Sequence, residues 1–186
     1  MEVEQTQLSG VFTVTPKRFR DERGWLSESY SQRAFEDLVA GVQFVQDNHS
    51  YSAKAQTLRG LHYQSPPHDQ IKLVGCVTGS IIDVAVDARR GSPTYGESAS
   101  VILSRENGKY LFIPKGFLHG FVTLEDGCDV VYKCSDFYAP QAEGGILWNS
   151  IGIDWGDVSD PILSEKDRDA ISFQDWSSPF DFEAGA

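Results

Sequence analysis

Two histidines on segments of β type are the side chains of this chain best suited to chemistry. His62 lies in Arg59-Gly60-Leu61-His62-Tyr63-Gln64, and His119 lies in a second segment, residues 113–121. Side chains on a strand face either a packed core or a cavity, and glycine and long polar groups flank both histidines. We therefore expect a cavity, where an imidazole with a pKa of about 6.5 can exchange protons or bind a metal.

Strands must position these histidines, because the dominant sequence pattern has a period of two. In residues 81–87, Ile82, Val84 and Val86 fall on one face, and the intervening residues fall on the other. Gly, Pro, Asn and Asp separate the apolar runs. Strands are expected at residues 11–15, 25–30, 44–50, 58–64, 71–77, 81–87, 98–104, 109–113, 121–124 and 129–134.

Many short strands joined by frequent turns predict an all-β sandwich or barrel. Helices are expected only at residues 31–40 and in a short stretch after Ser164. A chain of 186 residues is of ordinary size for one domain, so residues 1–186 are predicted to form one, with a tail from about residue 172 at the periphery.

The net charge of −11 argues against nucleic acid or an anionic membrane as partner, because both need a basic surface. An anionic small molecule would have to be held by Arg and Lys inside a pocket. No apolar run approaches the roughly 18 residues of a membrane span. Cys76, Cys128 and Cys134 form no Cys-x-x-Cys pair, so we expect reduced thiols, no zinc knuckle and a cytoplasmic protein.

A β-sandwich with Pro-x-Gly-x-x-His at a strand entry, here ending at His119, resembles the cupin or jelly-roll group. A cupin metal site needs three or four ligands, typically including two histidines spaced one residue apart. Gln64 stands two residues after His62, and His49 and His68 lie in polar stretches without a matching partner. The ligand set is incomplete, so we expect neither a metal nor another cofactor. A metal-dependent cupin that uses His62 and His119 stays as an alternative.

A set of motifs running from near residue 10 to near residue 170 resembles the dTDP-4-dehydrorhamnose 3,5-epimerase family. Each motif is weak alone, but their shared order over nearly the whole chain is specific. They are Phe19-x-Asp21-x-Arg23-Gly24, Gln46-Asp47-Asn48-His49-Ser50, Leu58-Arg59-Gly60-Leu61-His62, Gln70-x-Lys72-Leu73-Val74, Asp83-Val84-Ala85-Val86-Asp87, Ser92-Pro93-Thr94, Ile113-Pro114-x-Gly116-Phe117-x-His119-Gly120-Phe121, Tyr132-Lys133 and Leu163-Ser164-x-Lys166-Asp167.

The resemblance implies a metal-free jelly-roll homodimer that epimerises C3 and C5 of dTDP-4-keto-6-deoxyglucose. The product would belong to the route to dTDP-L-rhamnose and to lipopolysaccharide or cell-wall polysaccharide. Proton removal next to a ketone needs a base, an acid on the opposite face and a stabiliser of the enolate oxygen. By the resemblance, His62 is the base, Tyr132 the acid and Lys72 the stabiliser, while Asp167 holds the other ring nitrogen of His62.

Simpler structural roles compete with these assignments. Tyr132 could fill the core with its hydroxyl at the rim, and His62 could be a hydrogen-bonded structural residue. Asp167 follows Ser164 by three residues, which is also the spacing of a helix capping box. The two roles of Asp167 are expected to compete for one carboxylate. We favour the His–Asp pair, because capping boxes prefer Glu or Gln.

Strict alternation places Arg59 and His62 on opposite faces of their strand, although the family resemblance requires both in the pocket. A bulge at Gly60 could turn one of them. Lys72 lies between Ile71 and Leu73, so its side chain is expected on the face opposite to theirs, towards a cavity.

The resemblance assigns the nucleotide to a larger set of residues, with Tyr138 stacking on the base. The others are Arg23, Glu28, Gln46, Asn48, Arg59, His119, Glu143 and Lys166. Arginine suits a diphosphate because its planar fork donates two hydrogen bonds, although Arg23, Glu28 and Lys166 could also be ordinary solvated charges. In this family the arm that carries Arg23 comes from the partner subunit, so a homodimer would complete the site.

Gly75, Leu118 and Trp25 depart from residues that are usual in the family. These departures leave open a related sugar, or an enzyme that inverts only one of C3 and C5. A non-catalytic sugar-binding jelly roll is the remaining alternative, and it places no special requirement on Tyr132 or Asp167.

Overall fold

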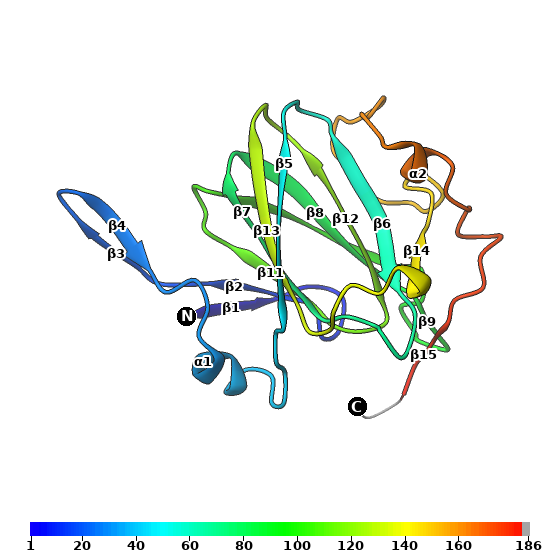
Figure 1. Cartoon of the computed structure of the whole chain (residues 1–186), viewed down its shortest axis with the longest axis horizontal. Coiled ribbons are helices and arrows are strands. Elements are labelled where there is room, and N and C mark those ends of the chain that lie inside the picture. The colour runs from blue at the N-terminus through cyan, green and yellow to red at the C-terminus, as the bar shows by residue number, and fades with distance from the viewer. Residues whose placement is uncertain (184–186) are drawn as a thin grey trace.

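The alternating apolar residues form two antiparallel β-sheets that pack face to face in the computed structural model, which describes residues 1–183 (Figure 1). The six-stranded sheet has the order β1 (Glu2–Gln5), β2 (Phe12–Thr15), β11 (Tyr110–Ile113), β7 (Lys72–Thr78), β13 (Cys128–Cys134) and β5 (Gln46–Ser52). The five-stranded sheet has the order β10 (Ser98–Ser104), β8 (Ser80–Asp87), β12 (Phe117–Thr123), β6 (Leu58–Gln64) and β14 (Glu143–Gly145). The predicted all-β, jelly-roll architecture is confirmed.

The strand β8 shows how the core is divided. Ile81 and Ala85 pack into the apolar layer between the two sheets, together with Val74 and Val130 of the opposite sheet. Ile82, Val84 and Val86 instead join a second apolar cluster that also contains aromatic residues from the C-terminal part of the chain. Both faces of this strand are therefore covered, which explains why its polar residues must find partners inside the protein.

Residues 173–183 lie on the outer face of the five-stranded sheet. Phe173, Trp176 and Phe180 pack in the cluster that covers this face, and the indole nitrogen of Trp176 donates to the Tyr63 hydroxyl at 2.9 Å. The short strand β15 (Phe180–Asp181) pairs with β9 (Arg89–Arg90). The tail is thus anchored by apolar contacts and by backbone hydrogen bonds.

Helices are few and short. The first, α1 (Gln32–Glu36), is shorter than the predicted helix at residues 31–40, and buries Phe35 against Phe12 and Phe112 on the outer face of the six-stranded sheet. The second, α2 (Glu165–Arg168), begins after Ser164 as predicted, and a single 3-10 turn, η1, spans Pro140–Ala142. No helix within residues 1–183 is long and apolar enough to cross a membrane.

Most predicted strands are confirmed to within two residues, and the larger errors have local causes. The strand predicted at residues 121–124 begins earlier, at Phe117, because Gly116 has a φ of +83° and turns the chain just before it. The strand predicted at residues 25–30 ends at Ser27 as β4 (Gly24–Ser27), which pairs with β3 (Arg18–Asp21) in a separate hairpin. β1, β3, β9, β14 and β15 were not predicted, because they lack alternation or are too short to show it.

A bulge at Gly60 settles where Arg59 and His62 point. On β12, Phe121 and His119 are two residues apart, yet their partners on β6 are Arg59 and His62, which are three apart. Gly60 has a φ of +126°, and a Cβ there would lie 2.6 Å from the Cα of Gly120. The extra residue in β6 turns the strand by one position, so that Arg59 and His62 line the same cavity.

Candidate active site

A cavity of about 490 Å³ is lined by strands of both sheets and by residues of α2. The helix α2 contacts β6, beside which it lies in Figure 1. Its lining brings together residues that are far apart in the sequence. Of the predicted site residues, the cavity is lined by Arg59, His62, Lys72, His119, Tyr132, Glu143, Lys166 and Asp167. The remaining predicted site residues, Arg23, Glu28, Gln46, Asn48 and Tyr138, lie outside this lining.

His62 and Asp167 form a close pair: Nε2 of His62 lies 2.5 Å from Oδ1 of Asp167. The carboxylate is buried, with 6% of the side chain exposed, whereas 31% of the His62 side chain is exposed. A carboxylate only accepts hydrogen bonds, so the proton of a neutral His62 resides on Nε2. This leaves the lone pair of Nδ1 free to act as a base.

The expectation that capping and pairing compete for Asp167 is wrong. The Ser164 hydroxyl oxygen accepts a hydrogen bond from the backbone N–H of Asp167 at 3.1 Å, which caps α2. The same hydroxyl donates to Oδ2 of Asp167 at 2.9 Å, while Oδ1 faces His62. Capping uses the backbone of Asp167 and pairing uses its carboxylate, so one residue does both.

The pKa of Asp167 reflects these contacts. Burial alone would raise it, but the hydrogen bonds from His62 and Ser164 outweigh burial and hold the pKa below its usual value. A depressed carboxyl pKa contributes stability at neutral pH that is lost as the pH falls through the folded-state value. At neutral pH Asp167 is therefore charged and can stabilise an imidazolium on His62.

Tyr132 and Lys72 approach the cavity from the sheet opposite His62. Tyr132 lies on β13 and packs partly against the core between the sheets, and burial raises the pKa of its hydroxyl. Its side chain therefore stays protonated at neutral pH and can donate a proton. Because His62 lies on the five-stranded sheet and Tyr132 on the six-stranded sheet, the two side chains line opposite walls of the cavity.

Lys72, on β7, turns into the cavity while its neighbour Leu73 packs on the outer face of the sheet. Burial lowers the pKa of the ammonium group, although the nearby Cys134, Asp83 and Glu143 act in the opposite direction. Within the described part of the chain, its Nζ atom has no hydrogen bond and no ion pair. Its donors are thus available to an anionic oxygen in the cavity.

A second buried His–Asp pair lies next to this site and was not predicted. Nε2 of His119 lies 2.7 Å from Oδ1 of Asp83, whose side chain is fully buried. Burial lowers the pKa of His119 despite this partner. Asp83 belongs to a motif quoted above, and alternation with Ala85 would have placed it on the inner face. Ser50, another residue of these motifs, also lines the cavity.

The mouth of the cavity carries a chain of polar contacts. The Tyr138 hydroxyl donates to Glu143 at 2.9 Å, and the ammonium of Lys166 lies 2.5 Å from the same carboxylate. Gln46 accepts a hydrogen bond from the backbone N–H of Tyr138 and donates to Asn48. Tyr138, Gln46 and Asn48 therefore adjoin the cavity without lining it.

Arg23 and Glu28 do not reach this cavity. Arg23 lies at the turn of the β3–β4 hairpin, which projects away from the sandwich (Figure 1). Its side chain is 89% exposed and pairs with Asp21 of the same turn. A single chain does not bring these two predicted binding residues together with the others.

The remaining histidines do not complete a metal site. His49 pairs with Asp129 and His68 with Asp136, and neither histidine lines the cavity. In the portion covered by the structure, residues 1–183, no three His, Cys, Asp or Glu side chains are grouped so that they could hold an ion.

Comparisons with known proteins show the family to which the chain belongs. The family model described as dTDP-4-dehydrorhamnose 3,5-epimerase matches residues 5–175. A Shigella flexneri protein of that name is 50% identical over 178 residues, which cover 94% of this chain and 97% of that protein. The Legionella pneumophila dTDP-6-deoxy-D-glucose-3,5-epimerase was solved with dTDP-4-keto-L-rhamnose. It is 40% identical with a TM-score of 0.93, and the match covers 98% of this chain and 99% of that chain.

A more distant similarity concerns the number of centres inverted. A 3'-monoepimerase from Streptomyces bikiniensis, solved with dTDP-quinovose, is 32% identical with a TM-score of 0.85, and the match covers 91% of this chain and 86% of that one. The same fold therefore carries both one-centre and two-centre epimerases.

The pair formed by His62 and Asp167 predicts the effect of Asp167→Asn. The backbone cap by Ser164 is retained, but the charge that stabilises an imidazolium is removed, so we expect the rate of proton transfer to fall by about 10²-fold or more. Steady-state kinetics together with a thermal unfolding curve measures both effects.

Ser164→Ala is the matched control, because it removes the cap and keeps the charge. It should cost roughly 0.5–2 kcal/mol of stability with a much smaller loss of rate per folded molecule. Full activity of Asp167→Asn would mean that the charge of the Asp167 carboxylate has no part in proton transfer.

Proposed function

Because the chain belongs to the dTDP-4-dehydrorhamnose 3,5-epimerase family and is thus a carbohydrate epimerase, we propose that its cavity inverts C3 and C5 of dTDP-4-keto-6-deoxyglucose by proton transfer. One observation carries the proposal: the paired base His62 and the protonated Tyr132 stand on opposite sheets. Inversion requires that a proton leave one face of a carbon and another arrive on the opposite face.

The proposed steps follow from the atoms that face the cavity. Nδ1 of His62 removes the proton from the carbon next to the C4 ketone, and the bonding electrons move onto the C4 oxygen. The ammonium of Lys72 stabilises the enolate, since its donors have no partner among residues 1–183. Tyr132 then protonates the carbon from the other face. Asp167 balances the charge of His62 while it holds the proton.

We propose that the nucleotide binds at the mouth of the cavity, through Gln46, Asn48, Arg59, His119, Glu143 and Lys166, with Tyr138 stacking on the base. The proposal is supported by charge. The chain has a net charge of −11, so a diphosphate needs local cations, and Arg59, Lys72 and Lys166 line this one cavity. The exposed ring of Tyr138 stands beside it, tied to Glu143.

Arg23 and Glu28 belong to the proposal only if the protein is a homodimer whose β3–β4 hairpin completes the partner's site. The hairpin supports this, because Phe19, Trp25 and Leu26 are all exposed, Leu26 to 74%. Apolar side chains gathered on a projecting hairpin are typical of a surface that another chain covers.

We also propose that residues 1–186 act as one catalytic domain in the cytoplasm and that the product enters the route to dTDP-L-rhamnose and surface polysaccharide. The family match over residues 5–175 supports the single domain. Cys76, Cys128 and Cys134 are all free and buried, as expected in a reducing compartment, and cell fractionation tests the location.

Solvent deuterium separates the roles of base and acid. His62→Ala should abolish exchange of the C3 and C5 hydrogens, because no enolate forms. Tyr132→Phe keeps the base and Lys72, so deuterium should still enter the sugar while inverted product falls by a factor on the order of 10² to 10⁴. NMR of the substrate with each variant in deuterated buffer gives both quantities.

The same spectra decide between the two-centre reaction and the one-centre reaction of the Streptomyces bikiniensis protein. Exchange at C5 as well as C3 in the wild-type protein supports the 3,5-epimerase. Wild-type exchange by His62→Ala would remove His62 as the base, and normal inversion by Tyr132→Phe would remove Tyr132 as the acid.

A metal-free mechanism predicts that activity survives exhaustive chelation. The incomplete ligand set around His62 motivates this expectation, since Gln64 replaces a second histidine. Turnover is measured before and after dialysis against a chelator, with metal content determined in parallel. Activity that disappears with chelator and returns with a divalent ion would instead support the metal-dependent cupin.

Subunit complementation tests the hairpin. His62→Ala lacks the base but keeps the hairpin, whereas Arg23→Ala keeps the base and damages the hairpin. If the hairpin serves the partner's site, co-expression should restore one intact site per heterodimer, which is about a quarter of wild-type activity for random pairing. If co-expression yields no more activity than the separate variants, the hairpin does not complete the partner's site.

A further inference from the structure

The segment between β13 and η1, residues 135–139, is held in place mainly by side chains. The last ladder-like contact is the backbone N–H of Ser135, which donates to the carbonyl of Ile71 at 3.0 Å. Beyond it, three glutamine side chains from three different parts of the fold bind consecutive backbone groups. Gln70 donates to the carbonyl of Asp136, and Gln46 accepts from the N–H of Tyr138.

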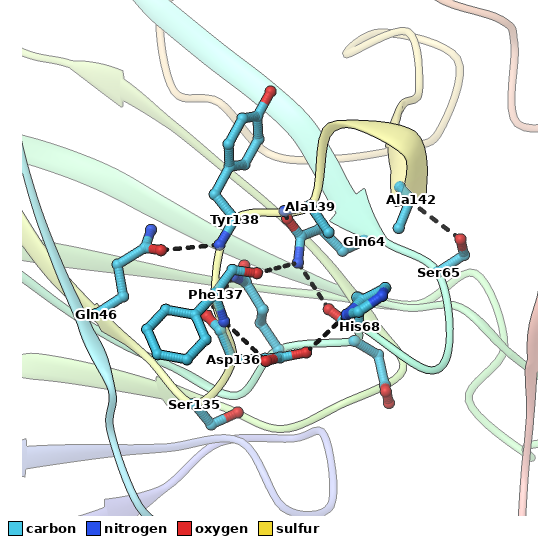
Figure 2. A network of polar contacts seen from close by, with 12 residues as sticks. Gln46, Gln64, Ser65, His68, Ser135, Asp136, Phe137, Tyr138, Ala139 and Ala142 are labelled. Atoms are coloured by element: carbon cyan, nitrogen blue, oxygen red, sulfur yellow. Dashed lines mark hydrogen bonds and ion pairs between the residues drawn. The ribbon is translucent and has the colours of Figure 1, made fainter.

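Gln64 binds three backbone groups through its side-chain amide, and it lies beside Phe137 and Ala139 in Figure 2. Its amide nitrogen donates to the carbonyls of His68 at 2.7 Å and Phe137 at 3.2 Å. Its amide oxygen accepts from the backbone N–H of Ala139 at 2.8 Å. With 6% exposure, the side chain is buried with both amide protons and its oxygen in use.

These contacts bracket Tyr138. Gln64 binds the residue before it and the residue after it, so the backbone that carries the exposed Tyr138 ring is tied to β6. His62 lies on the same strand, two residues before Gln64. The side-chain amide of Gln64 thus links the backbone on both sides of Tyr138 to the strand that carries His62.

We propose that Gln64 is a positioning residue for nucleotide binding. It holds the ring of Tyr138 at the place where the nucleobase stacks when the sugar of the same substrate lies next to His62. This rests on the proposed contact between Tyr138 and the base. An amide suits the task because it offers two donors and an acceptor at its tip, whereas a neutral imidazole offers one donor. The need for two donors and an acceptor also gives a reason for glutamine at position 64, where a metal-binding cupin would carry a second histidine.

The experiment is a double-mutant cycle in which calorimetry measures the affinity of each variant for dTDP. Gln64→Met keeps the length of the side chain but leaves backbone groups at Phe137 and Ala139 without partners. We expect dTDP to bind about tenfold more weakly or worse, while kcat at saturating substrate changes by less than about threefold. In Tyr138→Ala, which has already lost the ring, adding Gln64→Met should weaken binding little further.

Gln174→Met is the matched control, because Gln174 also donates to a backbone carbonyl, that of Ser150, in the segment outside the sandwich. It should leave dTDP binding unchanged. Additive losses in the double variant, or a loss of kcat as large as the loss of affinity, would overturn the proposal, since Gln64 would then act on something other than Tyr138.

Failure of the proposed nucleotide contact has a different signature. If Tyr138→Ala binds dTDP as well as wild type, the stacking role is wrong and the positioning role falls with it. If Tyr138→Ala weakens binding but Gln64→Met does not, only the positioning role is wrong. Should Gln64→Met fail to fold in a thermal unfolding test, Gln64→Glu decides by the same criteria, because a carboxylate keeps the acceptor for Ala139 but cannot donate to His68 and Phe137.

Discussion

The active-site geometry depends on the close approach of two backbones, at Gly60 on β6 and Gly120 on β12. A side chain on Gly60 would meet Gly120 and the carbonyl of His119 at less than 3 Å. The approach allows β6 to carry one extra residue, so that Arg59 and His62 share the cavity. Without it, strict alternation would turn one of them into the apolar cluster on the outer face.

The interior of this acidic protein is organised by paired charges. Two histidines each face a buried carboxylate, Asp167 for His62 and Asp83 for His119. Each carboxylate is held in the interior by its hydrogen bond to a histidine, and Asp167 is held by Ser164 as well. Among the cations that line the cavity, Lys72 forms no hydrogen bond or ion pair within the described residues. The cavity therefore offers a base and a positive centre in a protein whose overall charge repels anions.

Two residues with no proposed part in proton transfer, Ser164 and Gln64, hold other residues of the candidate site in place. Ser164 caps α2 and orients Asp167 at the same time, and Gln64 joins β6 to the segment of Tyr138 (Figure 2). The Tyr138 hydroxyl in turn donates to Glu143. Glu143 also pairs with Lys166, the chain neighbour of Asp167. Hydrogen bonds and short stretches of chain thus connect Tyr138 to the pair formed by His62 and Asp167.

Alternation and motif order in the sequence were sufficient to predict an all-β jelly roll, the inward direction of Lys72 and the family, because these depend on local pattern. Asp167 was predicted as the partner of His62 because the family resemblance assigns it that role. Asp83 belongs to a quoted motif but was given no role, so its pairing with His119 was not predicted. Whether Arg59 joins His62, whether Asp167 caps or pairs, and what Gln64 binds were decided by the tertiary structure. Each depends on contacts between strands or loops far apart in the chain, which no periodicity within one segment records.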